Sequence, residues 1–184
     1  MSASRHSRRR RPARAFTLVE AMISMTLIGL LTAAVLSSFV FTLRGEQSLA
    51  NYNTMNGDAR ELLERFSRDS KCALDVTNAT ATSVTMMIPY DTDPTHATSV
   101  TYEYSSGDGS VTREIGGVGM VLATGVSDTF AFTYLNIKNV ATTSLAEIKQ
   151  IQLSLRMVRT VSSATTSQYV ISAQYTLRSK PVAH

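Results

Sequence analysis

One long apolar segment limits what the N-terminal part of this chain can fold into. The 28 residues from Phe16 to Leu43 contain a single charged side chain, Glu20. As a helix with a rise of 1.5 Å per residue, such a segment is about 42 Å long, which exceeds the ~30 Å hydrocarbon core of a bilayer. The sequence therefore predicts a membrane-spanning helix over residues 16–43.

Basic charge is concentrated immediately before this segment. Residues 1–15 hold six arginines and no acidic residue, although the chain of 184 residues has a net charge of only +4. The remainder is therefore slightly acidic, which argues against direct binding of nucleic acid. The positive-inside rule predicts a single-pass membrane protein with a cytoplasmic N-terminus and everything after Arg44 on the extracytoplasmic side.

Two ordinary kinds of segment share this basic start and apolar core. A secretory signal peptide has an apolar core of only ~7–15 residues, although a small-x-small cleavage pattern occurs at Ser48-Leu49-Ala50. A plain membrane anchor accounts for the length. Neither explains Glu20, because a carboxylate in an apolar helix costs about 2.5–3.5 kcal/mol on insertion scales.

Glu20 gains a partner if the chain is cut just before Phe16. The new α-amino group is positively charged at neutral pH, and an apolar environment strengthens its attraction to a carboxylate. In a staggered stack of parallel helices, Glu20 of one subunit can reach the amine of its neighbour. Such pairs would fix the register of a helical bundle inside a membrane.

The residues around Phe16 resemble the class III signal of type IV prepilins and pseudopilins: Arg14-Ala15-Phe16-Thr17-Leu18-Val19-Glu20-Ala21-Met22-Ile23. This resemblance implies that a prepilin peptidase cuts between Ala15 and Phe16 and that Phe16 is N-methylated. It also implies that Glu20 docks subunits. Ala15 stands where the family usually has glycine.

A helical period continues beyond the membrane segment. Apolar residues recur at spacings of three and four, which indicates one buried face: Leu49, Tyr52, Met55, Ala59, Leu62, Leu63 and Phe66. We expect one helix from about residue 16 to 72, with a transmembrane half and an amphipathic half.

From Val76 onward the apolar period changes to two, which is typical of antiparallel strands with one buried face. Strands are expected near residues 84–88, 100–104, 111–115, 130–134, 151–157 and 169–177. Gly107-Asp108-Gly109 predicts a hairpin turn and the glycines of 116–119 predict a turn or bulge.

The predicted fold class is therefore α+β, with a long N-terminal helix packed on an antiparallel β-sheet head, as in type IV pilins. The expected divisions are a leader peptide (1–15), a transmembrane helix (16–43), its amphipathic continuation (44–75) and a β-rich extracytoplasmic head (76–184).

The head is similar, more weakly, to PilW-like minor pilins and to J-type pseudopilins of type II secretion. The stretches that carry this similarity are residues 61–69, 102–104, 125–135 and 172–180, together with Arg113. The resemblance implies a minor pilin or pseudopilin, a structural or initiating subunit of a type IV pilus or type II secretion pseudopilus. Its implied partners are other pilin or pseudopilin subunits, the prepilin peptidase, the inner-membrane assembly platform and the lipid bilayer.

Catalytic and metal sites have little support in the sequence. No nucleophile-and-base or zinc motif is present, so we expect neither an enzyme nor a cofactor. Asp91-Thr92-Asp93-Pro94 has the acid spacing of a calcium loop but also fits an ordinary loop. Cys72, the single cysteine, excludes an internal disulfide and is expected to be a small packing residue. The alternative function is a single-span, membrane-anchored extracytoplasmic binding or sensor domain that does not polymerise.

Overall fold

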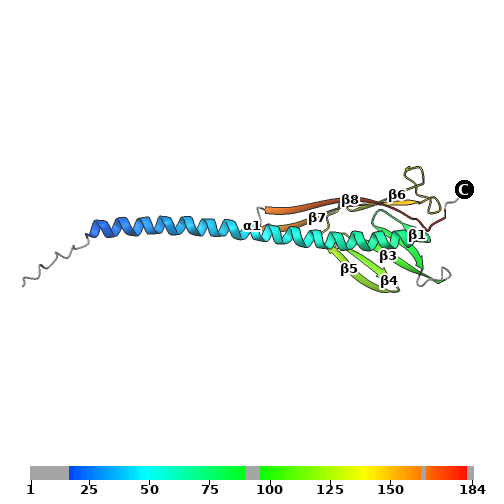
Figure 1. The fold of residues 1–184 in the computed structure, drawn as a ribbon, viewed down its shortest axis with the longest axis horizontal. Coiled ribbons are helices and arrows are strands. Elements are labelled where there is room, and N and C mark those ends of the chain that lie inside the picture. Colours follow the sequence, from blue (N-terminus) through cyan, green and yellow to red (C-terminus); the bar gives the residue numbers. More distant parts are fainter. Residues whose placement is uncertain (1–16, 90–95, 163–164, 182–184) are drawn as a thin grey trace, which may run out of the picture. The chain divides into compact units, whose positions relative to one another are not determined.

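A computed structural model describes residues 17–89, 96–162 and 165–181 (Figure 1). These residues form one long helix, α1 (Leu18–Cys72), followed by strands. The strands are β1 (Asp75–Ala79), β2 (Ser83–Pro89), β3 (Ala97–Ser105), β4 (Ser110–Ile115), β5 (Val118–Thr124), β6 (Ala131–Leu135), β7 (Gln150–Ser162) and β8 (Thr165–Thr176). The predicted α+β class is confirmed. The acidic loop at 91–94 lies outside the described residues.

The chain divides into two units, Met1–Arg44 and Gly45–His184. In the first unit, the described part is the bare first half of α1. Its large apolar side chains are 41% to 80% exposed, from Leu43 at the lower limit to Phe41 at the upper. By length and composition this helix can cross a membrane. Such a surface is stable only when lipid or other helices cover it.

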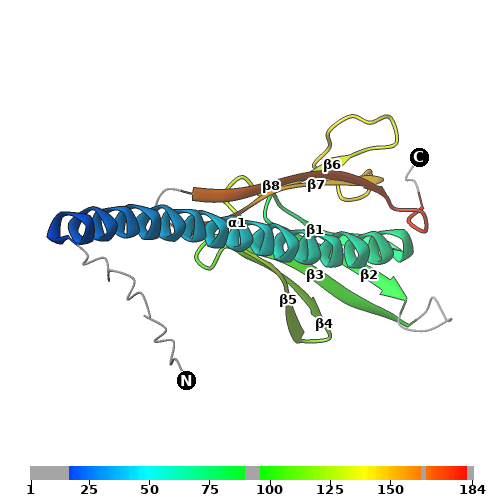
Figure 2. The same cartoon turned by 60° about the vertical axis from the view of Figure 1, so that its left-hand side comes forward.

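The second unit, called the head unit below, contains the rest of α1 and two antiparallel sheets. One sheet has the order β1-β2-β3-β4-β5 and the other β6-β7-β8. Figures 1 and 2 show the two sheets on different sides of the helix. Buried residues alternate along β2, β3, β6 and β7, as in the pairs Val84 with Tyr102 and Met86 with Val100. This alternation is the period of two that the sequence predicted.

The buried face of α1 begins further along the helix than the periodicity predicted. Met55, Ala59, Leu62 and Phe66 are buried. Leu49 and Tyr52 were also expected on this face, but they are 62% and 42% exposed. The prediction was wrong for these two residues although β8 reaches this part of the helix, where Ser48 Oγ lies 3.2 Å from Ser167 Oγ. The sheet meets the face that carries Ser48 and Asn51, which are partly buried, whereas Leu49 and Tyr52 lie beside that face in solvent.

Strand β5 was not predicted. The turn expected from the glycines is present, with positive φ at Gly116 and Gly117, but a strand follows it directly. β5 is an edge strand, and its register against β4 shifts between Val111 and Thr112, where Leu122 of β5 is left without a partner in the ladder. Val118 and Val121 are more than half exposed. An edge strand that lies largely in solvent does not need alternating residues, so the sequence carried no signal for it.

The hairpin turn predicted at residues 107–109 is confirmed between β3 and β4. Gly109 has a φ of +57°, and a Cβ there would lie 3.0 Å from the carbonyl oxygen of Val126. The glycine is therefore required by both its backbone conformation and the close approach of a neighbouring segment.

Candidate functional site

The N-terminal end of α1 holds Glu20, one of the three residues for which the sequence predicts a role. Thr17 precedes the helix, and its Oγ1 accepts a hydrogen bond of 3.2 Å from the backbone N–H of Glu20. Thr17 therefore acts as an N-cap, and Glu20, in the first turn, lies where a carboxylate interacts favourably with the helix dipole. The Glu20 side chain is exposed. It is free to meet a group from another molecule.

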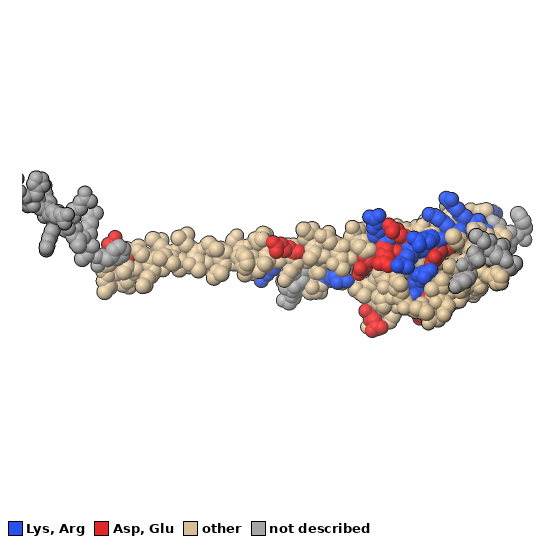
Figure 3. Space-filling model, turned by 60° about the horizontal axis from the view of Figure 1, so that its bottom comes forward, with Lys and Arg blue, Asp and Glu red and all other residues tan. Residues whose placement is uncertain are grey.

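Ala15 and Phe16, the residues of the expected cleavage and methylation, lie outside the described residues. The structure therefore shows Glu20 alone of the three predicted site residues. Glu20 is the single charge between Thr17 and Leu43, and Figure 3 shows charged side chains concentrated on the head unit instead. The roles of Ala15, Phe16 and Glu20 stay predictions.

A buried polar cluster joins α1 to the five-stranded sheet in the head unit. The Tyr102 hydroxyl donates a hydrogen bond of 2.7 Å to Asp69 Oδ2, and Arg113 Nε donates one of 2.8 Å to the same oxygen. The side chains of Asp69 and Arg113 are only 7% and 15% exposed. Buried charges persist when they are paired and hydrogen-bonded. This cluster therefore fixes one rotation of the helix against the sheet.

The electrostatics of the cluster follow from its burial. Burial raises the pKa of Tyr102 far above its ordinary value, and the nearby Asp69 carboxylate raises it further. The hydrogen bond to Asp69 raises the pKa of Arg113. Tyr102 therefore stays a neutral donor and Arg113 stays a cation at physiological pH. The cluster is suited to structural fastening rather than to proton transfer.

The Asp69 cluster could be located from the sequence only in part. The head resemblance included Asp69, Tyr102 and Arg113, in three separate stretches. Nothing in the sequence paired them, because hydrogen-bond partners 33 and 44 residues apart are set by the sheet register. The signal available was an acid, Asp69, on the apolar face of a helix, since an acid there requires a partner.

A second polar contact fastens the C-terminal segment, residues 177–181, over the end of α1. The ammonium group of Lys180 donates hydrogen bonds to Asp75 Oδ1 at 2.5 Å and to the Leu145 carbonyl at 2.8 Å. Ser179 Oγ donates to the Lys71 carbonyl at 3.1 Å and so satisfies one carbonyl in the last turn. The Lys180 side chain is 3% exposed. Sequence reasoning did not identify this residue, because a lysine near a chain end usually lies in solvent.

We expect the contact between Lys180 and Asp75 to make the stability of the protein depend on pH in the acidic range. The hydrogen bond from Lys180 lowers the pKa of Asp75 below its ordinary value. A carboxyl whose pKa is lower in the folded than in the unfolded protein stabilises the fold at pH values above its unfolded pKa, which is about 3.9 for aspartate. This stabilisation is lost as the pH falls through the pKa of the folded state. Asp75→Asn should therefore destabilise the protein at pH 6, and the difference from wild type should shrink as the pH falls below about 3.9.

Urea unfolding of the full chain in detergent micelles, followed by tyrosine fluorescence at several pH values, measures this difference. Asp108→Asn, an exposed aspartate in the turn between β3 and β4, is the matched control. A gap between wild type and Asp75→Asn that stayed constant from pH 6 to pH 3 would contradict the role given to Lys180.

One further residue that the sequence singled out, Cys72, lies in the head unit. Cys72 was expected to pack in the core, but it is free and exposed at the end of α1. The prediction was wrong because the helix turns Cys72 to solvent, whereas Ala73 is fully buried. Within the residues that the structure describes, no group of three or more His, Cys, Asp or Glu side chains could hold a metal ion.

Comparison with known proteins concerns the N-terminal part of the chain. A family model described as the prokaryotic N-terminal methylation motif matches residues 10–36. No curated protein matches the chain, and no solved structure matches it. The motif marks structural proteins of the pilin type rather than a family of enzymes. The chain therefore carries the N-terminal methylation signal of type IV pilin-like proteins, followed by a pilin-like helix and β-sheet head.

Proposed function

We propose that this protein is a minor pilin or pseudopilin, a structural or initiating subunit of a type IV pilus or a type II secretion pseudopilus. A prepilin peptidase removes residues 1–15 and methylates the amino group of Phe16. Residues 16–43 then hold the subunit in the inner membrane, and residues 44–184 lie on the periplasmic side. The observation that carries this proposal is the methylation motif at 10–36 on a helix that is long and apolar enough to span a membrane.

The exposure of that helix supports assembly into a filament. The Glu20 side chain is exposed at its N-terminal end, and the large apolar residues after it have no partner within the described chain. A subunit extracted from the membrane must cover this surface again, and parallel copies of the same kind of helix can do so. In such a bundle Glu20 meets the methylated amine of Phe16 from a neighbour, in an environment where an unpaired charge is costly.

The proposal also names partners. The prepilin peptidase and the membrane assembly platform act on the N-terminal helix, whereas other pilin or pseudopilin subunits pack beside it. The resemblance of the head to PilW-like minor pilins and J-type pseudopilins favours a minor subunit. Asp69 and Arg113, both within the resembling stretches, form the ion pair that joins helix and sheet.

The competing function is a membrane-anchored binding or sensor domain that does not polymerise. It predicts an intact N-terminus and tolerance of changes at Glu20. The mass of the N-terminal peptide from the membrane-bound protein separates the two functions. Proposed processing gives a peptide that begins at N-methylated Phe16, whereas a static anchor keeps the leader.

Replacing Glu20 with alanine should reduce incorporation into the filament at least about tenfold, which corresponds to about 1.4 kcal/mol for the lost charge pair. Membrane insertion should be unchanged or improved, because the variant removes a charge from an apolar helix. Sheared filaments and membranes from the native host, quantified by immunoblotting, measure both effects.

Glu46→Ala is the matched control, since Glu46 is an exposed acid on the same helix but beyond the apolar segment. It should be incorporated normally. Normal incorporation of the Glu20→Ala variant would remove the docking role and favour the anchored domain.

A further inference from the structure

We propose that a row of five charged residues on α1 is a docking surface for a parallel second copy of this chain, displaced by four residues along the helix. The charge row consists of Arg60, Glu61, Glu64, Arg65 and Arg68. This inference rests on the proposed function, since it concerns neighbouring subunits in an assembly. It implies that the head unit helps to set how far neighbouring subunits are displaced along the helix axis.

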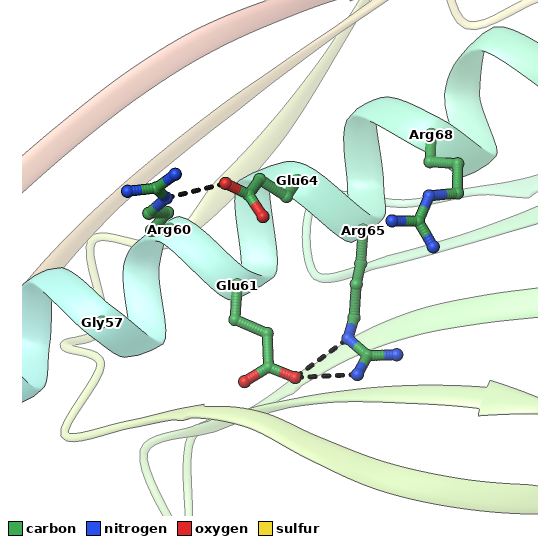
Figure 4. Close-up of a pocket in the computed structure, with 6 residues that line it drawn as sticks. All are labelled: Gly57, Arg60, Glu61, Glu64, Arg65 and Arg68. Atoms are coloured by element: carbon green, nitrogen blue, oxygen red, sulfur yellow. Dashed lines mark hydrogen bonds and ion pairs between the residues drawn. The ribbon is translucent and has the colours of Figure 1, made fainter.

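The charge row lies on the side of α1 that the two sheets leave open. Figure 4 shows its side chains projecting from consecutive turns, with Gly57 at the start of the same surface. These residues line a shallow hollow of about 320 Å³. Gly57 has no neighbouring atom within 4 Å of a Cβ built on it. Another helix can therefore approach this face without displacing part of the head unit.

Within one chain the charge row is only partly satisfied. Arg60 Nε lies 2.7 Å from Glu64 Oε1, and Arg65 Nη2 lies 2.9 Å from Glu61 Oε1. Arg68 has no ion pair among the described residues. The Arg60 and Glu64 side chains are 77% and 59% exposed, so their pair contributes little to stability in water. These side chains can exchange partners at small cost.

The order of charges is compatible with a parallel neighbour displaced by four residues. When residue n of one helix is level with residue n−4 of the next, Glu64 faces Arg60, Arg65 faces Glu61, and Arg68 faces Glu64. The unpaired Arg68 thereby gains a carboxylate. With no displacement, each charged residue faces the identical residue of the other chain. With a displacement of three, Glu64 faces Glu61 and Arg68 faces Arg65. Both arrangements oppose like charges.

Two other displacements also bring opposite charges together. A displacement of one residue places Glu61 opposite Arg60 and Arg65 opposite Glu64, and a displacement of seven places Arg68 opposite Glu61. The choice of four comes from the other end of α1. Phe16 and Glu20 are themselves four residues apart, so the docking proposed there requires the same displacement. The docking proposed at Phe16 and Glu20 and the charge row thus share one spacing in the sequence, four residues.

Cysteine cross-linking between two tagged copies measures the displacement directly. In a Cys72→Ser background, one copy carries Asn53→Cys and the other carries Gly57→Cys. Both positions are exposed, lie four residues apart and leave all five charges intact. The copies are produced together in the native host, and filaments are oxidised and separated by tag. We expect the mixed 53–57 dimer to exceed either same-position dimer at least about fivefold.

Charge reversal then tests whether the row sets this displacement. Glu64→Arg places arginines opposite each other at two of the three contacts and should lower the 53–57 dimer about fivefold. Adding Arg60→Glu and Arg68→Glu to that variant reverses three of the five charges and restores opposite charges at each of the three contacts. This triple variant should recover the dimer to within about twofold of the starting protein.

Glu114→Arg is the matched control, because it makes the same charge change at an exposed position on β4. It should leave the 53–57 dimer unchanged. The outcomes separate the two proposals. Filaments with N-methylated Phe16 that give only same-position dimers, no dimer, or a 53–57 dimer insensitive to Glu64→Arg would overturn the docking role of the charge row. An intact leader and absence from filaments would instead overturn the proposed function.

Discussion

Replacing Asp69 with alanine is expected to lower the free energy of unfolding of the head unit by about 3–5 kcal/mol. The substitution removes the one acceptor that Tyr102 and Arg113 share and leaves both donors in the interior. Arg113, whose side chain is 15% exposed, then holds an uncompensated charge. Losing one partner of a buried pair is costly, because the desolvation of the other partner is no longer offset.

Urea unfolding of the full chain in detergent micelles, followed by near-ultraviolet circular dichroism of the tyrosines, measures this loss. Glu61→Ala is the matched control, since it removes an acid from the same helix but from an exposed pair with Arg65. Its effect should stay below about 0.5 kcal/mol. The buried cluster would have no fastening role if the two variants were equally stable. The double variant Asp69→Leu/Arg113→Met should be more stable than Asp69→Ala, because it removes both charges.

Replacing Phe66 with alanine should also cost about 3–5 kcal/mol. Phe66 is fully buried and contacts both sheets: its ring centroid lies 4.9 Å from that of Tyr102, 5.6 Å from that of Phe132 and 5.2 Å from that of Tyr175. Removing the ring leaves a cavity where helix and sheets meet. Aromatic pairs also add stability beyond the area that they bury.

The same unfolding measurement applies, with Tyr52→Ala as the matched control. Tyr52 lies on the same helix but is 42% exposed, and its loss should cost less than about 1 kcal/mol. If Phe66→Ala were no more harmful than Tyr52→Ala, the head unit would not depend on Phe66 for the contact between helix and sheets. Phe66→Leu should recover part of the loss, because it refills most of the volume.

The two predictions concern residues that the sequence identified to different degrees. Phe66 belongs to an apolar period of three and four, so its burial could be predicted. Asp69 is one turn further on the same face, and its burial could be explained only after Tyr102 and Arg113 were seen beside it. Local periodicity reports which face of a helix is apolar, whereas the partner of a buried charge comes from a distant part of the chain.

The sequence by itself determined the long helix, most strands and the methylation signal. Each depends on local information: an uninterrupted apolar segment, an alternation of two residues, or a short motif around Phe16. The tertiary structure alone decided that Leu49 and Tyr52 are exposed, that β5 forms an edge strand, that Cys72 faces solvent and that Lys180 is buried. These features depend on which segments meet across the chain and on which face of the helix each sheet contacts, and residue spacing contains neither kind of information.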